Sequence, residues 1–464
     1  MHNLERILSS LGFALWIAVA TWWLNHNAPF SELYRFGWEY GKIAAALAEG
    51  RGFSDAMGPG SGPTAWMPPL LPILYATIFA VAGVKTSAAA VLCCALRSLA
   101  GGLCLYWLQG WCTGPWTRRM ACLLALAALS LDRLHSLCDL NDAWLINLGL
   151  CAVVSICLRL QQPSPMPTFY YFLAALIPML SPVLTLVLAL GLVLQAGQRK
   201  KEVLALGLAC LVPCLLWGMR HRLVLGQFYP IKSNLWFDFV EANLLDDDGI
   251  LTTSTVYRFH PIRGGPSGQS YRRLGEREFV EQARQHSAQV NGTQWRTRCW
   301  RRFLNASWRL QPERDFALAS NLQSADLEGL ANTDLLMVSK GIPFWTFMYR
   351  DSAQMLANSS EPQRTLWMNS RMQAEIEFWR HQESWDVRVW SYAFTLLPTL
   401  ASLMLALSGC RDKTARVCLL CYWTFLTPYI LVQHYARYQV SAIFVQIYLI
   451  LAAARLVKGW IRRN

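Results

Sequence analysis

The stretch ILSSLGFALWIAVATWWL, residues 7–24, decides the fold class of this chain, because its 18 residues carry no charge. The hydrocarbon core of a bilayer is about 30 Å thick, and a helix crosses it with ~20 apolar residues. Residues 18–20, Ala-Val-Ala, imitate a signal-peptidase site, but the apolar run continues past them to Leu24. We therefore expect an uncleaved signal anchor that spans the membrane.

Similar apolar runs recur along the chain, whose 464 residues are 54% hydrophobic and only 15% charged. This composition is typical of a polytopic membrane protein rather than a soluble one. The run 169–196 is broken at Ser181-Pro182 and has basic flanks, which favours a re-entering hairpin of two short helices. The other runs that cross a bilayer, or nearly so, are 88–108, 120–131, 143–158, 203–217, 389–407, 417–432 and 440–456.

The net charge of +13 does not indicate a nucleic-acid partner, because the basic residues cluster beside the apolar runs. Lys and Arg in such places mark the cytoplasmic ends of spans. If residues 68–84 form a surface helix that starts at a proline, ten spans remain and every basic cluster is cytoplasmic. If residues 68–84 cross the membrane, the number of spans becomes odd and the basic C-terminus faces outside. We prefer ten, so that 25–87, the turn around 132–142 and 219–388 face away from the cytoplasm.

We therefore expect an all-α polytopic membrane protein. Residues 1–218 form an N-terminal transmembrane module with a first outer loop at 25–87, residues 219–388 form an extracytoplasmic loop domain, and residues 389–464 form the C-terminal transmembrane helices. Within the large loop, residues 295–309 interleave Arg with Trp and Phe. This pattern predicts an amphipathic helix on lipid head groups, although it also suits binding of a substrate phosphate.

A single acidic residue in the first outer loop carries the chemistry that we expect. Glu39 lies in WEYGKIA, residues 38–44, between the signal anchor and the proline-rich segment 62–72. A carboxylate held on a short helix at the membrane surface can act as a general base. Glu32 and Asp55, in the same loop, are reserve candidates. The alternative is that Glu39 is only a solvated charge on a helix.

The first loop resembles that of the GT-C superfamily of membrane glycosyltransferases, especially the branch of protein O-mannosyltransferases and aminoarabinose transferases. Residues 40–44 and the glycine turn 50–53 resemble the family's juxtamembrane helix. The proline pair at 68–69 resembles the pair that opens the next helix, and 434–438 resembles the terminal Arg-Tyr element of bacterial members. The resemblance is strong over residues 1–90 and weak over most of 219–388.

Two positions depart from the family pattern. The loop carboxylate of the best-known members falls at Phe36 here, whereas Glu39 lies one helical turn further along, as in a bacterial subgroup that carries Glu at this place. The Lys that often precedes the proline pair and contacts the donor phosphate is replaced by Met67. Another cation must then take over that contact.

The resemblance implies an enzyme of the bacterial inner membrane with a GT-C-like helix bundle and outer-face juxtamembrane helices. It would move a sugar from a polyprenyl-phosphate donor to a glycan, lipid or protein acceptor on the periplasmic side, in contact with membrane lipid. Glu39 would be the base. The residues expected at the donor phosphate are Arg437, His434, Tyr438 and, as a weaker candidate, Lys232. For the Arg and Tyr at this helix end, the alternative is interfacial snorkelling.

We expect no cofactor. Asp139 and Asp142 offer oxygen ligands for a divalent cation, but two carboxylates three residues apart are more often a helix cap or a solvated turn. A lipid-linked-sugar flippase or transporter is the main rival to an enzyme, and a non-catalytic assembly subunit is the third reading. A transporter distributes polar residues along several spans, whereas here they gather at one face, which favours the enzyme.

Overall fold

The computed structural model describes residues 2–27, 39–128, 142–195, 197, 199–245, 249–251, 259–263, 265–308, 385–434 and 437–462. Within these ranges the regular structure is helical and no β-strand occurs; two isolated bridges pair Ser54 with Pro63 and Ile250 with His434. The all-α class predicted from the apolar runs is confirmed.

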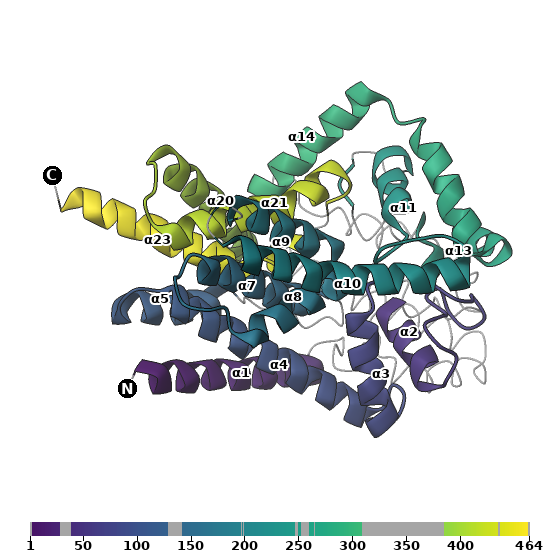
Figure 1. Ribbon diagram of the computed structural model, residues 1–464, viewed down its shortest axis with the longest axis horizontal. Helices are drawn as coiled ribbons and strands as arrows, with labels where there is room; N and C mark the ends of the chain where they lie inside the picture. The colour runs from purple at the N-terminus through teal and green to yellow at the C-terminus, as the bar shows by residue number, and fades with distance from the viewer. Residues whose placement is uncertain are drawn as a thin grey trace.

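Six helices in the described part of the chain are long and apolar enough to cross a membrane. They are α1 (His2–Asn27), α4 (Ser87–Trp111), α7 (Ala143–Leu160), α10 (Lys200–Leu225), α21 (Lys413–Leu431) and α23 (Ile443–Ile461). The helices α5 (Pro115–Ala128), α8 (Thr168–Leu180), α9 (Pro182–Gln195) and α20 (Trp385–Leu407) run beside them in one bundle (Figure 1). Leucines such as Leu204 and Leu216 are exposed on its outer surface. The protein is a multi-pass helical membrane protein.

The expected break in the run 169–196 is confirmed. Helix α8 ends at Leu180, Ser181 adopts an extended backbone with φ −163° and ψ 135°, and α9 begins at Pro182. Proline has no N–H to donate within a helix and its ring clashes with the preceding turn, so one helix ends here and another begins. Whether this pair re-enters the membrane from one side stays a prediction.

Helices α1 and α4 pack closely because two neighbouring glycines lie at their contact. A Cβ atom on Gly102 would lie 2.7 Å from the carbonyl oxygen of Ser10, and one on Gly101 would lie 2.5 Å from Cδ1 of Ile17. Small residues of this kind allow the backbones of membrane helices to approach. Helix α1 is therefore part of the packed bundle.

The start of α1 and the end of α23 lie at the same end of the bundle (Figure 1). Basic side chains there join the neighbouring helix ends to one another: Arg6 donates to the carbonyl of Tyr106 at 2.9 Å, and Arg199 donates to the carbonyl of Ser164 at 3.0 Å. We call this region the basic end. Because the chain begins and ends at the same end of the bundle, this arrangement agrees with the even number of spans that we prefer.

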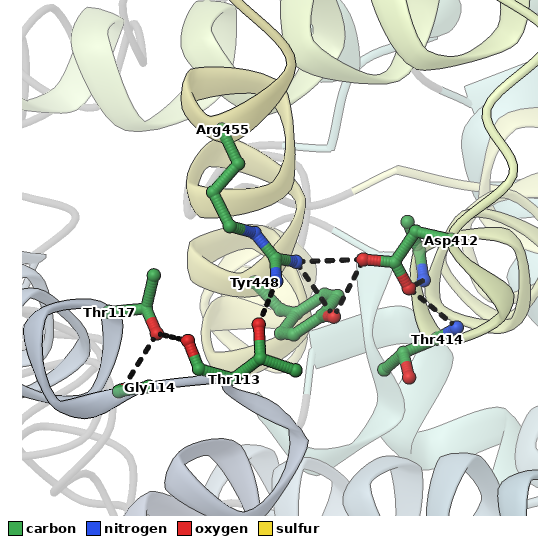
Figure 2. A network of polar contacts seen from close by, with 8 residues as sticks. Thr113, Gly114, Thr117, Asp412, Thr414, Tyr448 and Arg455 are labelled. Carbon is green, nitrogen blue, oxygen red and sulfur yellow. Dashed lines mark hydrogen bonds and ion pairs between the residues drawn. The ribbon is translucent and has the colours of Figure 1, made fainter. Parts of the chain in front are cut away.

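A polar network at the basic end ties the C-terminal helix to two turns (Figure 2). Arg455 on α23 donates to the carboxylate of Asp412 at 2.8 Å, to the hydroxyl of Tyr448 at 3.0 Å and to the hydroxyl of Thr113 at 2.8 Å. The other oxygen of Asp412 caps α21 by accepting from the backbone N–H of Thr414 at 2.9 Å. One carboxylate thus serves as a helix cap and as an ion-pair partner.

The opposite end of the bundle carries a second group of helices (Figure 1). These are α2 (Glu39–Ala48), α3 (Leu70–Ala82), α11 (Leu235–Val240) and α13 (Gly265–Ser287), with the short turns η2 (Glu241–Leu245), η3 (Pro261–Arg263) and α22 (Arg437–Val440) and the peripheral helix α14 (Gly292–Trp308). The 13 residues of α3 reach about 20 Å at 1.5 Å per residue. This is shorter than a bilayer core, as expected for a juxtamembrane helix that starts after the proline pair.

Candidate active site

The acidic residue singled out by the sequence begins helix α2. Glu39 lies in the first turn, where the positive end of the helix dipole stabilises a carboxylate. Its side chain is buried, with 7% of the residue exposed. The interpretation of Glu39 as a solvated helix charge is therefore wrong, because the packed end of the bundle removes it from water.

The carboxylate of Glu39 pairs with a histidine from the large loop. The distance from Nε2 of His260 to Oε1 of Glu39 is 3.2 Å. The backbone N–H of Ile262 donates to Nδ1 of the same ring at 3.3 Å. A ring nitrogen that accepts an N–H carries no proton, so the proton of the neutral imidazole lies on Nε2 and points at the carboxylate.

Two neighbouring aromatic rings contact the imidazole. Trp66 meets the ring of His260 edge-to-face with centroids 5.8 Å apart, and Phe237 does the same at 5.5 Å. Edge-to-face contacts of this kind fix the plane of a ring. Trp66 comes from the segment before the proline pair and Phe237 from α11, so two separate parts of the chain define the position of one side chain.

A fully buried carboxylate joins α13 to this region. Oε1 of Glu276 accepts from the backbone N–H of Ala65 and from the hydroxyl of Ser233, each at 2.7 Å. Oε2 accepts from the hydroxyls of Tyr271, at 2.7 Å, and Thr64. Burial raises the pKa of Glu276 above its usual value, although these hydrogen bonds act in the opposite direction. Its oxygens are occupied by structural contacts.

The reserve candidate Asp55 holds a turn of the first loop. It has a positive φ of 64°, and its carboxylate accepts from Nε of Arg51 at 3.0 Å and from the backbone N–H of Gly62 at 3.3 Å. Aspartate tolerates this left-handed conformation better than most residues. These contacts shape the loop, and a role of Asp55 as a base stays a prediction. Glu32 lies outside the described residues.

Lys232 lies next to the segment in which Met67 replaces the family's lysine. The backbone N–H of Ser233 donates to the carbonyl of Ala65 at 2.8 Å, so the segment around Lys232 lies beside the segment around Met67. Nζ of Lys232 lies 3.4 Å from a carboxylate oxygen of Asp238 on α11. The structure therefore brings Lys232 to the same end of the bundle as Glu39 and His260.

The start of α7 connects helix α2 with the terminal Arg-Tyr element. The hydroxyl of Tyr40, next to Glu39, donates to Asp142 at 2.7 Å. One helical turn further along α7, the amide of Asn147 donates to the carbonyl of Val440 at 2.6 Å. Val440 ends α22, which begins at Arg437. The two segments that the sequence assigns to the base and to the donor phosphate thus share one support.

Within the terminal element, Tyr438 is buried and stacks on Tyr429 with ring centroids 3.9 Å apart. Burial lowers the pKa of His434 to about 3, and the charge of Arg302 adds to this effect. His434 is therefore neutral at pH 7 and offers phosphate an N–H at most, not a positive charge. The side chain of Arg437 lies outside what the structure describes.

Two arginines of α14 have a role that the sequence did not reveal. Arg302 is fully buried and donates to the carbonyls of Gly249 at 2.6 Å and Ala242 at 2.9 Å, and Arg298 donates to the same Ala242 carbonyl at 3.2 Å. The expectation that all basic residues of this helix face lipid head groups is wrong for these two. In contrast, Trp300 is 58% exposed.

Sequence reasoning missed His260, which no motif marks and which only the folded chain brings to Glu39. Among the described residues, no group of three or more His, Cys, Asp and Glu side chains is arranged to hold a metal ion. Asp139 lies outside these ranges, whereas Asp142 accepts from Tyr40. Comparison of the chain with protein-family models, with curated proteins and with solved structures finds no match.

Proposed function

We propose that this protein is an integral-membrane glycosyltransferase that moves a sugar from a polyprenyl-phosphate donor to a glycan, lipid or protein acceptor. The observation that carries the proposal is the buried carboxylate of Glu39, held in an aromatic-lined cluster at the end of the bundle away from the basic end. A carboxylate kept out of water there is suited to take a proton at the membrane surface. The resemblance of the first loop to GT-C enzymes supports the same assignment.

The distribution of basic residues supports an outward-facing site. The clusters around Arg6, Arg199, Arg416 and Arg455 belong to the basic end, and Lys and Arg accumulate at the cytoplasmic ends of membrane helices. Glu39 then faces the periplasm of a bacterial inner membrane. This is the side on which a polyprenyl-phosphate sugar meets acceptors outside the cell.

The proposed reaction is a displacement at the anomeric carbon of the donor sugar. The acceptor O–H or N–H gives its proton to the carboxylate of Glu39 while the acceptor atom forms a bond to the anomeric carbon. The bond from this carbon to the phosphate oxygen breaks, and polyprenyl phosphate leaves with the electron pair. Cations stabilise the charge on the leaving phosphate, and Lys232 and Arg437 are our candidates for this role.

The test is sugar transfer by purified protein in lipid nanodiscs with Glu39→Gln. Loss of the base should lower transfer by ~10²–10⁴-fold without loss of folding. Glu49→Gln is the matched control, because Glu49 lies at the end of the same helix and pairs with Arg51 at the surface. Transfer that is unchanged in Glu39→Gln would remove Glu39 from the active site. Movement of the intact donor across the bilayer without transfer would favour a flippase.

A further inference from the structure

The geometry points to His260 as the positioning residue of Glu39: its Nε2–H holds one carboxylate oxygen and so fixes where the carboxylate takes its proton. This inference rests on the proposed function for its catalytic meaning. The pair itself is a property of the folded chain that can be measured without any substrate.

The hydrogen bond at Nδ1 determines what Nε2 can do. Ile262 belongs to the short turn η3 and donates its backbone N–H to Nδ1 at 3.3 Å. A backbone N–H cannot change into an acceptor, so this contact selects the tautomer with the proton on Nε2. Nε2 lies 3.2 Å from Oε1 of Glu39, within reach of a hydrogen bond to the carboxylate.

The surroundings prevent the imidazole from leaving this position easily. Its ring lies edge-to-face against Trp66 and Phe237, and 9% of His260 is exposed. A hydrogen bond in such a water-poor place is stronger than one at the surface. The donor is therefore already in place before a substrate arrives, and no solvent has to be displaced to form the contact.

Two other buried carboxylates in the described part of this end of the bundle have partners of their own. Glu276 receives four hydrogen bonds from its own partners, and Asp238 is paired with Lys232 and with the amide of Asn234. Glu39 is the carboxylate that the structure pairs with the imidazole.

The contact affects the transfer step through the carboxylate alone. While Oε1 accepts from His260, the carboxylate stays oriented and its charge is stabilised as it takes the proton of the acceptor. His260 moves no proton itself, so the step remains balanced as described above: one proton passes to Glu39 and the polyprenyl phosphate leaves with the electron pair. His260 is a positioning residue rather than a catalytic residue.

Two variants separate the hydrogen bond from ring packing. His260→Gln keeps an N–H donor near the place of Nε2 but has no ring, whereas His260→Phe keeps a ring for Trp66 and Phe237 but has no donor. We expect His260→Phe to lower kcat about 10- to 100-fold, the range for a hydrogen bond to a charged group, with little change in KM. His260→Gln should recover most of this loss.

His221 supplies the matched control, because it is also fully buried against aromatic rings, those of Trp217 and Tyr229. His221→Phe and His221→Gln should not reproduce this pattern of loss and recovery. A result in which His260→Phe transfers sugar normally while His260→Gln fails would show that the ring, not the donor, matters, and would overturn the inference.

The second measurement is ¹⁵N NMR of histidine-labelled protein in nanodiscs without substrate. The chain has 8 His, and subtraction of the His260→Gln spectrum isolates His260. We expect a protonated Nε2 and an accepting Nδ1, with a shift of the Nε2 signal in Glu39→Ala but not in Glu49→Gln. A protonated Nδ1, or an Nε2 signal that ignores Glu39→Ala, would overturn the inference.

The two failures are distinguishable. If the wild-type protein transfers no sugar from polyprenyl-phosphate donors, the proposed function fails, and the NMR result still decides whether His260 holds Glu39. If transfer occurs and the NMR result is negative, the positioning role fails and the glycosyltransferase assignment stands.

Discussion

Glu276 provides the sharpest test of how the end of the bundle opposite the basic end is built. We predict that Glu276→Leu undocks α13, whereas Glu276→Gln leaves it in place. Leucine leaves the donors of Ala65, Ser233, Tyr271 and Thr64 without their acceptor in a buried place.

The expected magnitude follows from the four contacts. A buried donor without a partner costs ~1–3 kcal/mol, and three of the four donors are hydroxyls that can rotate towards other acceptors. We therefore expect a loss of about 3–5 kcal/mol. Glutamine keeps an oxygen where Ala65 and Ser233 donate and places an NH₂ near Tyr271 and Thr64, whose hydroxyl oxygens can accept, so its cost should be near 1 kcal/mol.

Hydrogen exchange in nanodiscs is the suitable assay, because the membrane helices can remain folded when α13 undocks. In Glu276→Leu, amides of α13 (Gly265–Ser287) should lose protection by ~10²–10⁴-fold, the equivalent of this free energy. Amides of α7 are the internal reference and should not change. Equal protection of α13 in the Leu and Gln variants would refute the reasoning that these hydrogen bonds hold it.

Three further predictions concern stability. Burial raises the pKa of Glu276, so the folded protein binds a proton on this carboxyl group more tightly than the unfolded chain does. The stability that this proton contributes is present at low pH and is lost as the pH rises through the raised pKa. Glu276→Gln should therefore flatten this part of a plot of Tm against pH. Gly102→Val places a Cβ against the carbonyl of Ser10 and should lower Tm and the yield of folded protein, whereas the same change at the unobstructed Gly207 should cost much less. Asp412→Ala removes both the cap of α21 and the partner of Arg455 and should lower stability by ~1–2 kcal/mol, more than Asp412→Asn, which keeps a capping oxygen; equal losses in thermal unfolding would contradict the capping role.

The sequence was sufficient for features that depend on local patterns. Apolar runs predicted the membrane helices, and the Ser181-Pro182 pair predicted the break between α8 and α9, because proline lacks the N–H that a continuous helix would use there. Helix α3 begins after the proline pair as expected. Glu39 could be selected because it lies in the local motif WEYGKIA, just before the proline-rich segment.

The sequence was insufficient for features that depend on distant contacts. His260 lies more than two hundred positions from Glu39, in a region without periodicity, so no local pattern links the two. The contacts of the arginines of α14 could not be predicted for a related reason: an alternation of Arg and aromatic residues is the same in sequence whether an Arg contacts lipid or the backbone carbonyls of a neighbouring segment. Only packing decides that Arg302 turns inward.

The position of α7 has a consequence for how the protein tolerates different membranes. In an apolar stretch of 18 residues, 83% of the residues of α7 are buried, compared with 22% in α10 and 28% in α1. A bilayer that thickens or thins acts on the helices that touch it, and these respond by tilting. Tyr40 and Val440 are both hydrogen-bonded to residues at the start of the shielded helix α7. The segments that contain Glu39 and Arg437 should therefore keep their positions while the lipid-facing helices adapt to the membrane.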